Sequence, residues 1–231
     1  VYPESRQTPL PELRHFNGLG GFSKDGSEYV IRLEKDQTTP APWSNIVANP
    51  NFGFLTSESG GGYTWSANSR ENKITPFSND AVSDRPGEIL YVSDESSANW
   101  TITPQPIREE SAYTITHGFG YTQYEHTSHG IDGRMTQFVP LYDKVKLSAI
   151  RLHNHHDSAK TITLTYYVHP VMGVDPSQTA NSLVTDRIED GPLIFTNNTS
   201  VDYKGKIGFI DSSSTKSSVT GDRDEFFGTS G

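Results

Sequence analysis

The chain has 231 residues, with 28 acidic and 19 basic side chains and a formal net charge of −9. Nucleic acids and anionic membranes both favour clustered lysine and arginine, so this charge and the scattered basic residues disfavour either partner. There is no cysteine, which excludes disulfides and thiolate chemistry and is consistent with a reducing compartment. No run approaches the ~20 apolar residues of a membrane-spanning helix.

The composition and the spacing of turn-forming residues indicate a folded β-protein. Mean hydropathy is −0.59, yet 11 tyrosines and 11 phenylalanines supply large side chains for a core. Fourteen prolines argue against long helices, and short β-branched and aromatic runs recur between Gly, Pro, Asn, Asp and Ser. The predicted strands are Tyr29–Leu33, Phe52–Thr56, Ile89–Val92, Tyr113–His117, Tyr121–His126, Arg134–Val139, Val145–His153, Thr161–His169, Leu193–Asn197 and Lys206–Ile210.

Two adjacent segments, Val145–His153 and Thr161–His169, predict a β-hairpin, because side chains in each alternate between two faces and a polar run, HHDSAK, separates them. The same run suggests a metal site, since His153 and His155 share one face of an extended strand. A structural zinc site needs a third and a fourth ligand, and no second HxH or CxxC motif supplies them. We therefore expect a polar turn and no metal.

The most informative segment is Gly60–Asp80, with the sequence GGGYTWSANSRENKITPFSND. An aromatic ring covers the apolar C–H patch of a pyranose, and amides, carboxylates and guanidinium groups satisfy its hydroxyls. This mixture predicts a carbohydrate-binding surface. The other interpretation is a polar loop that caps a β-sandwich, with Trp65 in the core and Arg70–Glu71 as a solvated pair. The candidate substrate-binding residues here are Tyr63, Trp65, Asn68, Arg70, Glu71, Asn72, Asn79 and Asp80.

Several longer stretches resemble one family. They are FNGLGGFSKDGSEYVIRL at Phe16–Leu33, the segment Thr39–Asp80, HGFGYTQYEHTSHGI at His117–Ile131 and FVPLYDKVK at Phe138–Lys146. The family is the family-94 glycoside hydrolases, formerly glycosyltransferase family 36, which includes cellobiose and chitobiose phosphorylases and cyclic β-1,2-glucan synthases. Within the family, these motifs look most similar to those of the cyclic β-1,2-glucan synthase or β-glucan phosphorylase branch. The resemblance covers roughly residues 14 to 228.

The resemblance implies an all-β fold, a β-supersandwich similar to galactose mutarotase, which an (α/α)-barrel catalytic domain follows in the family. We expect residues 1–15 to be a linker and residues 16–231 to form a single β domain that precedes the barrel of a longer parent, itself a glycoside phosphorylase or glycosyltransferase. The family's general acid lies in the barrel, and nothing here resembles the barrel, so catalysis by the chain alone is not expected.

The resemblance also implies partners. These are a β-linked glucan or oligosaccharide, the helical-barrel domain of the same parent and, in a homodimer, a second copy. No cofactor is implied, and the implied location is the cytoplasm, as a free protein or within an inner-membrane-anchored parent. The segment Pro170–Asn181, PVMGVDPSQTAN, is similar to a region where some members reach towards the acceptor sugar, which adds Gln178 and Thr179 as candidates.

Two other functions stay open: a stand-alone lectin-like module and a mutarotase-like aldose-processing enzyme. The second draws on His117, Glu125, His126 and His129, because a mutarotase needs a general acid and a general base across a pyranose. Cross-strand packing of His117 and His126 explains the same pattern, and a similar fold does not by itself carry chemistry. Near the end of the sequence, Phe226 and Phe227 are expected to dock on another element.

Overall fold

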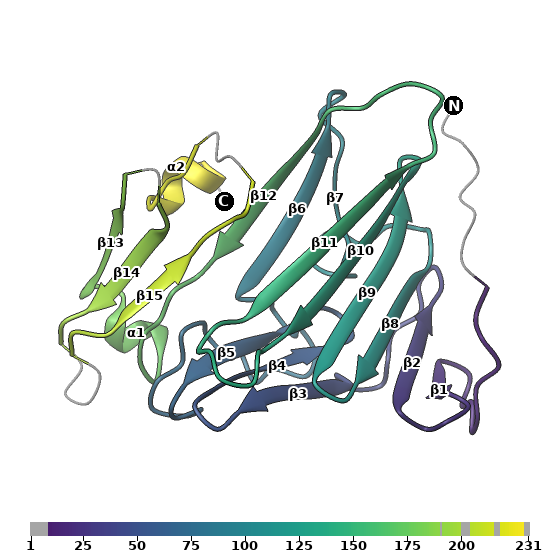
Figure 1. Ribbon diagram of the computed structural model, residues 1–231, viewed down its shortest axis with the longest axis horizontal. Helices are drawn as coiled ribbons and strands as arrows, with labels where there is room; N and C mark the ends of the chain where they lie inside the picture. The colour runs from purple at the N-terminus through teal and green to yellow at the C-terminus, as the bar shows by residue number, and fades with distance from the viewer. Residues whose placement is uncertain (1–8, 190, 200–203, 215–217, 229–231) are drawn as a thin grey trace.

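The computed structural model describes residues 9–189, 191–199, 204–214 and 218–228. Its named strands pair antiparallel, and helix is confined to two short turns, α1 (Pro176–Thr179) and α2 (Arg223–Phe227), so the predicted all-β fold is confirmed (Figure 1). Within the described part of the chain, no helix is long and apolar enough to cross a membrane.

The largest element is a six-stranded antiparallel sheet with the order β1-β2-β8-β9-β10-β11. Its longest strands, β9 to β11, lie side by side at the front of the view in Figure 1. The strands are β1 (Gly20–Phe22), β2 (Glu28–Leu33), β8 (Tyr113–Gly118), β9 (Tyr121–Ser128), β10 (Ile131–Phe138) and β11 (Leu147–Asn154).

Three smaller sheets of three strands each complete the fold, with the orders β3-β4-β5, β12-β6-β7 and β13-β14-β15. In Figure 1 the β3–β5 sheet crosses below the six-stranded sheet, and β13–β15 lie at the far left. The strands are β3 (Ser44–Asn49), β4 (Phe52–Ser57), β5 (Gly62–Ser66), β6 (Glu88–Asp94), β7 (Asn99–Thr101), β12 (Ile162–Val168), β13 (Leu183–Arg187), β14 (Leu193–Asn197) and β15 (Ile207–Ile210).

Alternation with a period of two places the core between the sheets. Every second residue of β9 is buried, whereas the residues between them are partly exposed. The buried face of β9 packs with β8 and β10 against β6 and β7, which contribute Val92 and Trp100. The largest fully buried side chains of this region are Trp100, Tyr113, Tyr124, Ile31, Ile102, Ile115 and Val92.

The hairpin predicted from Val145–His153 and Thr161–His169 is wrong. β11 pairs with β10, whereas β12 pairs with β6 in another sheet, so the polar segment between them carries the chain from one sheet to the other. The inner faces of both strands adjoin the same inter-sheet space. Their alternation is therefore the same whether the two strands pair directly or belong to different sheets.

The docking expected for the paired phenylalanines is confirmed. Phe226 and Phe227 of α2 lie against the outer face of the β6–β12 pair, with ring centroids 5.3 and 4.9 Å from that of Tyr167. Phe226 also lies 6.5 Å from Tyr91. The short helix begins at Asp222, whose carboxylate accepts hydrogen bonds from the backbone amides of Asp224 and Glu225.

One buried tyrosine joins the six-stranded sheet to the β3–β5 sheet. The Tyr124 hydroxyl lies 2.7 Å from Thr56 Oγ1 and donates to the Ser57 carbonyl at 2.6 Å. Burial raises the pKa of this hydroxyl, which therefore stays protonated and available as a donor. Beside it, Asn45 Nδ2 donates to the carbonyls of Gly118 and Tyr121.

Removing the Tyr124 hydroxyl tests its role in joining the two sheets. We expect Tyr124→Phe to lower the free energy of unfolding by about 1–3 kcal/mol, because the Ser57 carbonyl and Thr56 hydroxyl lose a buried partner. Urea denaturation followed by tryptophan fluorescence measures the change. The control is Tyr142→Phe, since Tyr142 is 93% exposed and should tolerate the change. Equal stability of the two variants would show that the hydroxyl is dispensable.

Candidate functional site

An aromatic tract lies on the outer face of the β3–β5 sheet. Tyr63 and Trp65 are two residues apart on β5, and their ring centroids are 5.3 Å apart. Phe77, from the loop after β5, lies 4.7 Å from Tyr63 at an interplanar angle of 33°. All three rings are partly exposed, so Trp65 is not the core residue that the loop interpretation required.

A glycine on the neighbouring strand lets the Trp65 ring lie close to the sheet. Gly53 is the cross-strand partner of Trp65, and a Cβ atom at position 53 would meet Trp65 Cζ2 at 2.5 Å and the Ala48 methyl at 2.6 Å. No side chain fits there. One face of the Trp65 ring therefore packs against Gly53, beside Ala48, and this packing fixes the orientation of the ring.

The three glycines at the start of β5, Gly60–Gly62, pack closely against neighbouring segments. A Cβ atom at Gly61 would meet the Asp84 carboxylate at 2.3 Å, and one at Gly62 would meet the Leu55 carbonyl at 2.0 Å. These glycines let the chain pack against β4 and the loop around Asp84, whose carboxylate also accepts from Ser59 at 2.6 Å. They position β5 rather than admit a ligand.

Most of the predicted polar residues shape the turn that follows β5. Asn68 Oδ1 accepts from the backbone amides of Arg70 and Glu71, both at 2.9 Å. Asn72 is buried, and its Nδ2 donates to the Ser66 carbonyl at 3.0 Å. Arg70 and Glu71 form a 3.4 Å ion pair exposed to solvent. Asn68 and Asn72 therefore act on the backbone, and only the Arg70–Glu71 pair presents polar groups outward.

Asn79 and Asp80 lie apart from that turn, in the loop between β5 and β6. Asn79 is exposed and has a positive φ of 47°. The Asp80 carboxylate accepts from the backbone amide of Val82 at 2.9 Å and from the Ser83 hydroxyl at 2.7 Å. The Ser83 hydroxyl is the main reason why the pKa of Asp80 is lowered. Both residues serve the local turn.

The structure brings the two predicted sugar-contacting segments together. Lys73 and Gly173 exchange two backbone hydrogen bonds, both 3.0 Å, and Lys73 also bridges to Trp65 across the edge of β5. Lys73 Nζ donates to the Val174 carbonyl at 3.0 Å. The turn carrying Arg70 and the α1 segment carrying Gln178 therefore adjoin, although about a hundred residues separate them in sequence. Thr179 is buried and faces Gly173 instead of solvent.

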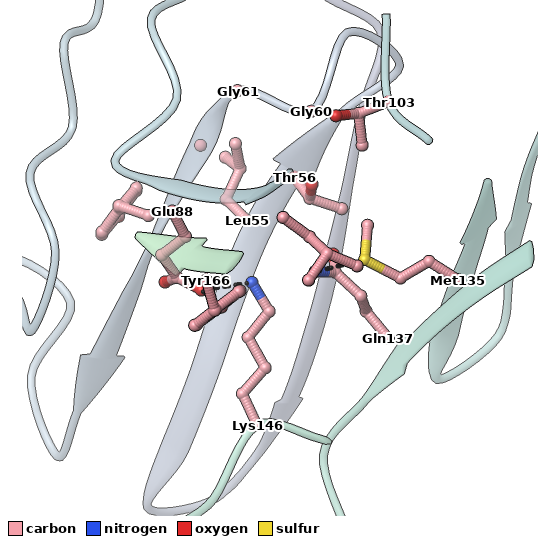
Figure 2. Close-up of a pocket in the computed structure, with 13 residues that line it drawn as sticks. Leu55, Thr56, Gly60, Gly61, Glu88, Thr103, Met135, Gln137, Lys146 and Tyr166 are labelled. Atoms are coloured by element: carbon pink, nitrogen blue, oxygen red, sulfur yellow. Dashed lines mark hydrogen bonds and ion pairs between the residues drawn. The ribbon is translucent and has the colours of Figure 1, made fainter. Parts of the chain in front are cut away.

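A second polar cluster lies in the inter-sheet space and was not predicted. Lys146 Nζ lies 2.9 Å from Glu88 Oε2, which also accepts from the Tyr166 hydroxyl at 2.8 Å (Figure 2). The hydroxyls of Thr64 and Thr75 donate to Glu88 Oε1 at 2.5 and 3.0 Å. In sequence these residues are scattered over three strands and two loops, so their spacing does not predict that they meet.

The electrostatics of this cluster favour a charged carboxylate. Burial alone would raise the pKa of Glu88, but the Lys146 ammonium and the hydroxyls of Thr64 and Tyr166 outweigh it and hold the pKa at about 2. The adjoining cavity measures about 20 Å³, which accommodates about one water molecule and no sugar ring. The cluster is therefore a structural brace between β6, β12 and the segment before β11.

The four residues proposed for a mutarotase-like site do not form one group. Glu125 and His126 are consecutive on β9 and point to opposite faces: Glu125 pairs with Arg134 at 2.6 Å, whereas the His126 side chain is fully buried. His126 Nε2 lies 2.7 Å from Glu109 and its ring stacks on Tyr113 at 3.8 Å. His129 Nε2 lies 3.5 Å from the same Glu109 carboxylate, so His126 and His129 share one partner, on the face of β9 opposite to Glu125.

The other histidines have local partners. His117 Nε2 donates to the Trp43 carbonyl at 2.9 Å, and burial lowers the pKa of His117. His155 Nε2 lies 2.6 Å from the Asp132 carboxylate and 4.7 Å separates its ring centroid from that of His153. Among the residues that the structure describes, no three His, Asp or Glu side chains are arranged to hold a metal ion.

Fold and sequence together define the class of this protein. The chain belongs to the family-94 glycoside hydrolases, as their β-supersandwich domain: the family model described as "Glycosyl hydrolase 94, supersandwich domain" matches residues 27–231.

The relatives are much longer enzymes. The chain is 34% identical, over 95% of its length, to the cyclic β-(1,2)-glucan synthase NdvB of Rhizobium meliloti (strain 1021), of which it spans 8%. It is 33% identical over 64% of its length to the N,N'-diacetylchitobiose phosphorylase of Vibrio proteolyticus, and 28% identical over 65% to the solabiose phosphorylase of Paenibacillus borealis. It spans 19% and 20% of those two enzymes.

The Glu88–Lys146 pair makes a pH prediction. The pKa of Glu88, about 2 in the folded state, lies below its ordinary value of 4.5. The charged Glu88 carboxylate stabilises the fold fully above pH 4.5, and this stabilisation is lost as the pH falls towards 2. Each unit by which the folded-state pKa lies below the unfolded-state pKa corresponds to about 1.4 kcal/mol in the free energy of unfolding. We expect Glu88→Gln to remove this part of the acid slope, measured by thermal unfolding between pH 7 and 2.

Removing the Lys146 ammonium tests the other half of the Glu88–Lys146 pair. Lys146→Met should destabilise the protein by about 3–5 kcal/mol, because it leaves Glu88 buried without its counter-ion. Lys144→Met, two residues away and exposed, should change stability by less than about 0.5 kcal/mol. Similar losses in the two lysine variants would contradict the assigned role of the pair.

Proposed function

We propose that this chain is a non-catalytic, carbohydrate-interacting domain of a larger glucan synthase or glycoside phosphorylase. The observation that supports it best is that the strand carrying the Tyr63–Trp65–Phe77 aromatic tract adjoins the turn after Arg70, which in turn adjoins the segment before α1, through backbone bridges at Lys73. The relatives act on β-(1,2)-glucan and N,N'-diacetylchitobiose, which favours a β-linked saccharide as the ligand.

The chemistry of this surface suits a sugar chain. A ring supported from below, as Trp65 is by Gly53, presents a fixed apolar face to the C–H patch of a pyranose. The exposed Arg70–Glu71 pair supplies donors and acceptors for hydroxyl groups at low cost in desolvation, because both side chains are solvated before binding. A surface without a deep pocket binds one saccharide weakly, roughly in the millimolar range.

The same surface also suits bracing of a catalytic barrel in the parent protein. Partly exposed aromatic rings are typical of protein interfaces as well as of sugar platforms, and the two roles make different predictions for a variant. The mutarotase-like alternative has less support, because Glu125 and His126 lie on opposite faces of β9.

Removing the Trp65 ring separates these roles. If the surface binds sugar, Trp65→Ala should abolish binding of β-1,2-linked gluco-oligosaccharides, and Arg70→Ala should weaken it by about 1.5–3 kcal/mol. Amide chemical shifts and tryptophan fluorescence report binding. Tyr142→Ala, an exposed aromatic on the β10–β11 loop, is the control and should bind normally. Shifts confined to residues far from Gly60–Asp80 would remove this assignment.

Catalysis provides an independent check. The chain alone should not release glucose 1-phosphate from β-glucans and phosphate, because the family's general acid belongs to the barrel. Coupled phosphorolysis assays measure this directly. Turnover that is lost in Glu125→Gln or His126→Ala would overturn the non-catalytic assignment.

A further inference from the structure

Two strands that follow each other in sequence leave one side of the sandwich open. β11 is the last strand of the six-stranded sheet and β12 is an outer strand of the β12-β6-β7 sheet, so among the described residues each pairs on one side only. Both run without proline or a bulge, β11 over eight residues and β12 over seven. Long regular edges of this kind offer unpaired backbone donors and acceptors to another strand.

The side chains at this edge face inward and are still exposed. Ile150 pairs across the sheet with Met135, and Leu164 pairs with Val92, so both belong to the faces that form the core. Even so, Ile150 is 37% and Leu164 43% exposed. Tyr166, on the same face of β12, is 36% exposed although its hydroxyl bonds Glu88. The inter-sheet space is therefore open between β11 and β12.

The outer face of β11 is basic, which favours an acidic residue on any strand that pairs with its free edge. Arg151 lies directly across from Arg134. Glu125 neutralises Arg134, at 2.6 Å, whereas Arg151 is exposed and forms no ion pair with any residue that the structure describes. Two like charges opposite each other on neighbouring strands are unfavourable unless a carboxylate approaches. The free edge of β11 is the side from which an acidic residue on a further strand would reach Arg151.

We propose that β11 and its open inter-sheet space bind an extended polypeptide segment, which adds as a strand with apolar residues towards Ile150 and an acidic residue beside Arg151. Pairing of β11 with β11 of a second copy is a poor fit, because β11 carries Arg151 and His153 and no acidic residue. The proposed contacts, Ile150 and Arg151, are on β11 and not on the β5 strand that carries the aromatic tract, so the inference goes beyond the proposed carbohydrate role.

Two peptides of one length test the proposal. Each has ten residues of alternating valine and threonine between pairs of serines, with one central threonine replaced by glutamate in the first peptide and by lysine in the second. We expect the glutamate peptide to shift the amide resonances of Leu147–Asn154 and to bind about fivefold more tightly than the lysine peptide. Salt should reduce this preference.

A charge reversal makes the test specific. Arg151→Glu should reverse the preference, so that the lysine peptide binds more tightly, and it should not unfold the protein because the side chain is exposed and unpaired. Arg187→Glu, on the edge strand β13, is the matched control and should leave the preference unchanged.

Three results would overturn the proposal. One is the absence of β11 shifts with either peptide at millimolar concentration. The second is a preference that Arg151→Glu does not change. The third is concentration-dependent dimerisation in sedimentation experiments that protects the β11 amides from hydrogen exchange, which would identify a second copy as the occupant.

Discussion

The Tyr124 hydroxyl holds the layers of this domain in place. It lies on the buried face of β9 and reaches across to β4, where it donates to the Ser57 carbonyl and meets Thr56 Oγ1. That contact fixes how the β3–β5 sheet crosses the six-stranded sheet, and with it the direction in which the opposite face of β5 points. The aromatic tract lies on the opposite face of the same sheet, so the contacts of Tyr124 and Asn45 hold the sheet with that face outward.

The Glu88–Lys146 pair likewise joins separate elements, at the open side of the sandwich. Its charges lie in the inter-sheet space, and four hydroxyl or ammonium donors surround the carboxylate. Buried ion pairs are a weak source of net stability but a strong source of specificity, because every misaligned arrangement leaves a charge unpaired. Where strand edges are free, this pair sets the position of β12 relative to the start of β11.

The candidate surface shows how local and functional roles divide among polar residues. Asn68, Asn72 and Asp80 bond to nearby backbone groups, so their side chains shape the loops on either side of the aromatic tract. The Arg70–Glu71 pair and the rings of the tract are instead exposed or partly exposed, and the proposed binding role rests on them. The Lys73–Gly173 bridge then joins this turn to the α1 segment, which makes one surface from two loops.

The sequence by itself determined the all-β class, because alternating β-branched and aromatic runs with frequent prolines allow little else, and its motifs identified the family. It missed β1, β3, β5, β7 and β13, which are short or rich in polar and glycine residues. Only the tertiary structure decided that β11 and β12 lie in different sheets, since the two arrangements share one alternation pattern. It also decided that Glu125 and His126 diverge and that Lys146 meets Glu88, because such encounters depend on strand order across sheets and leave no local signal.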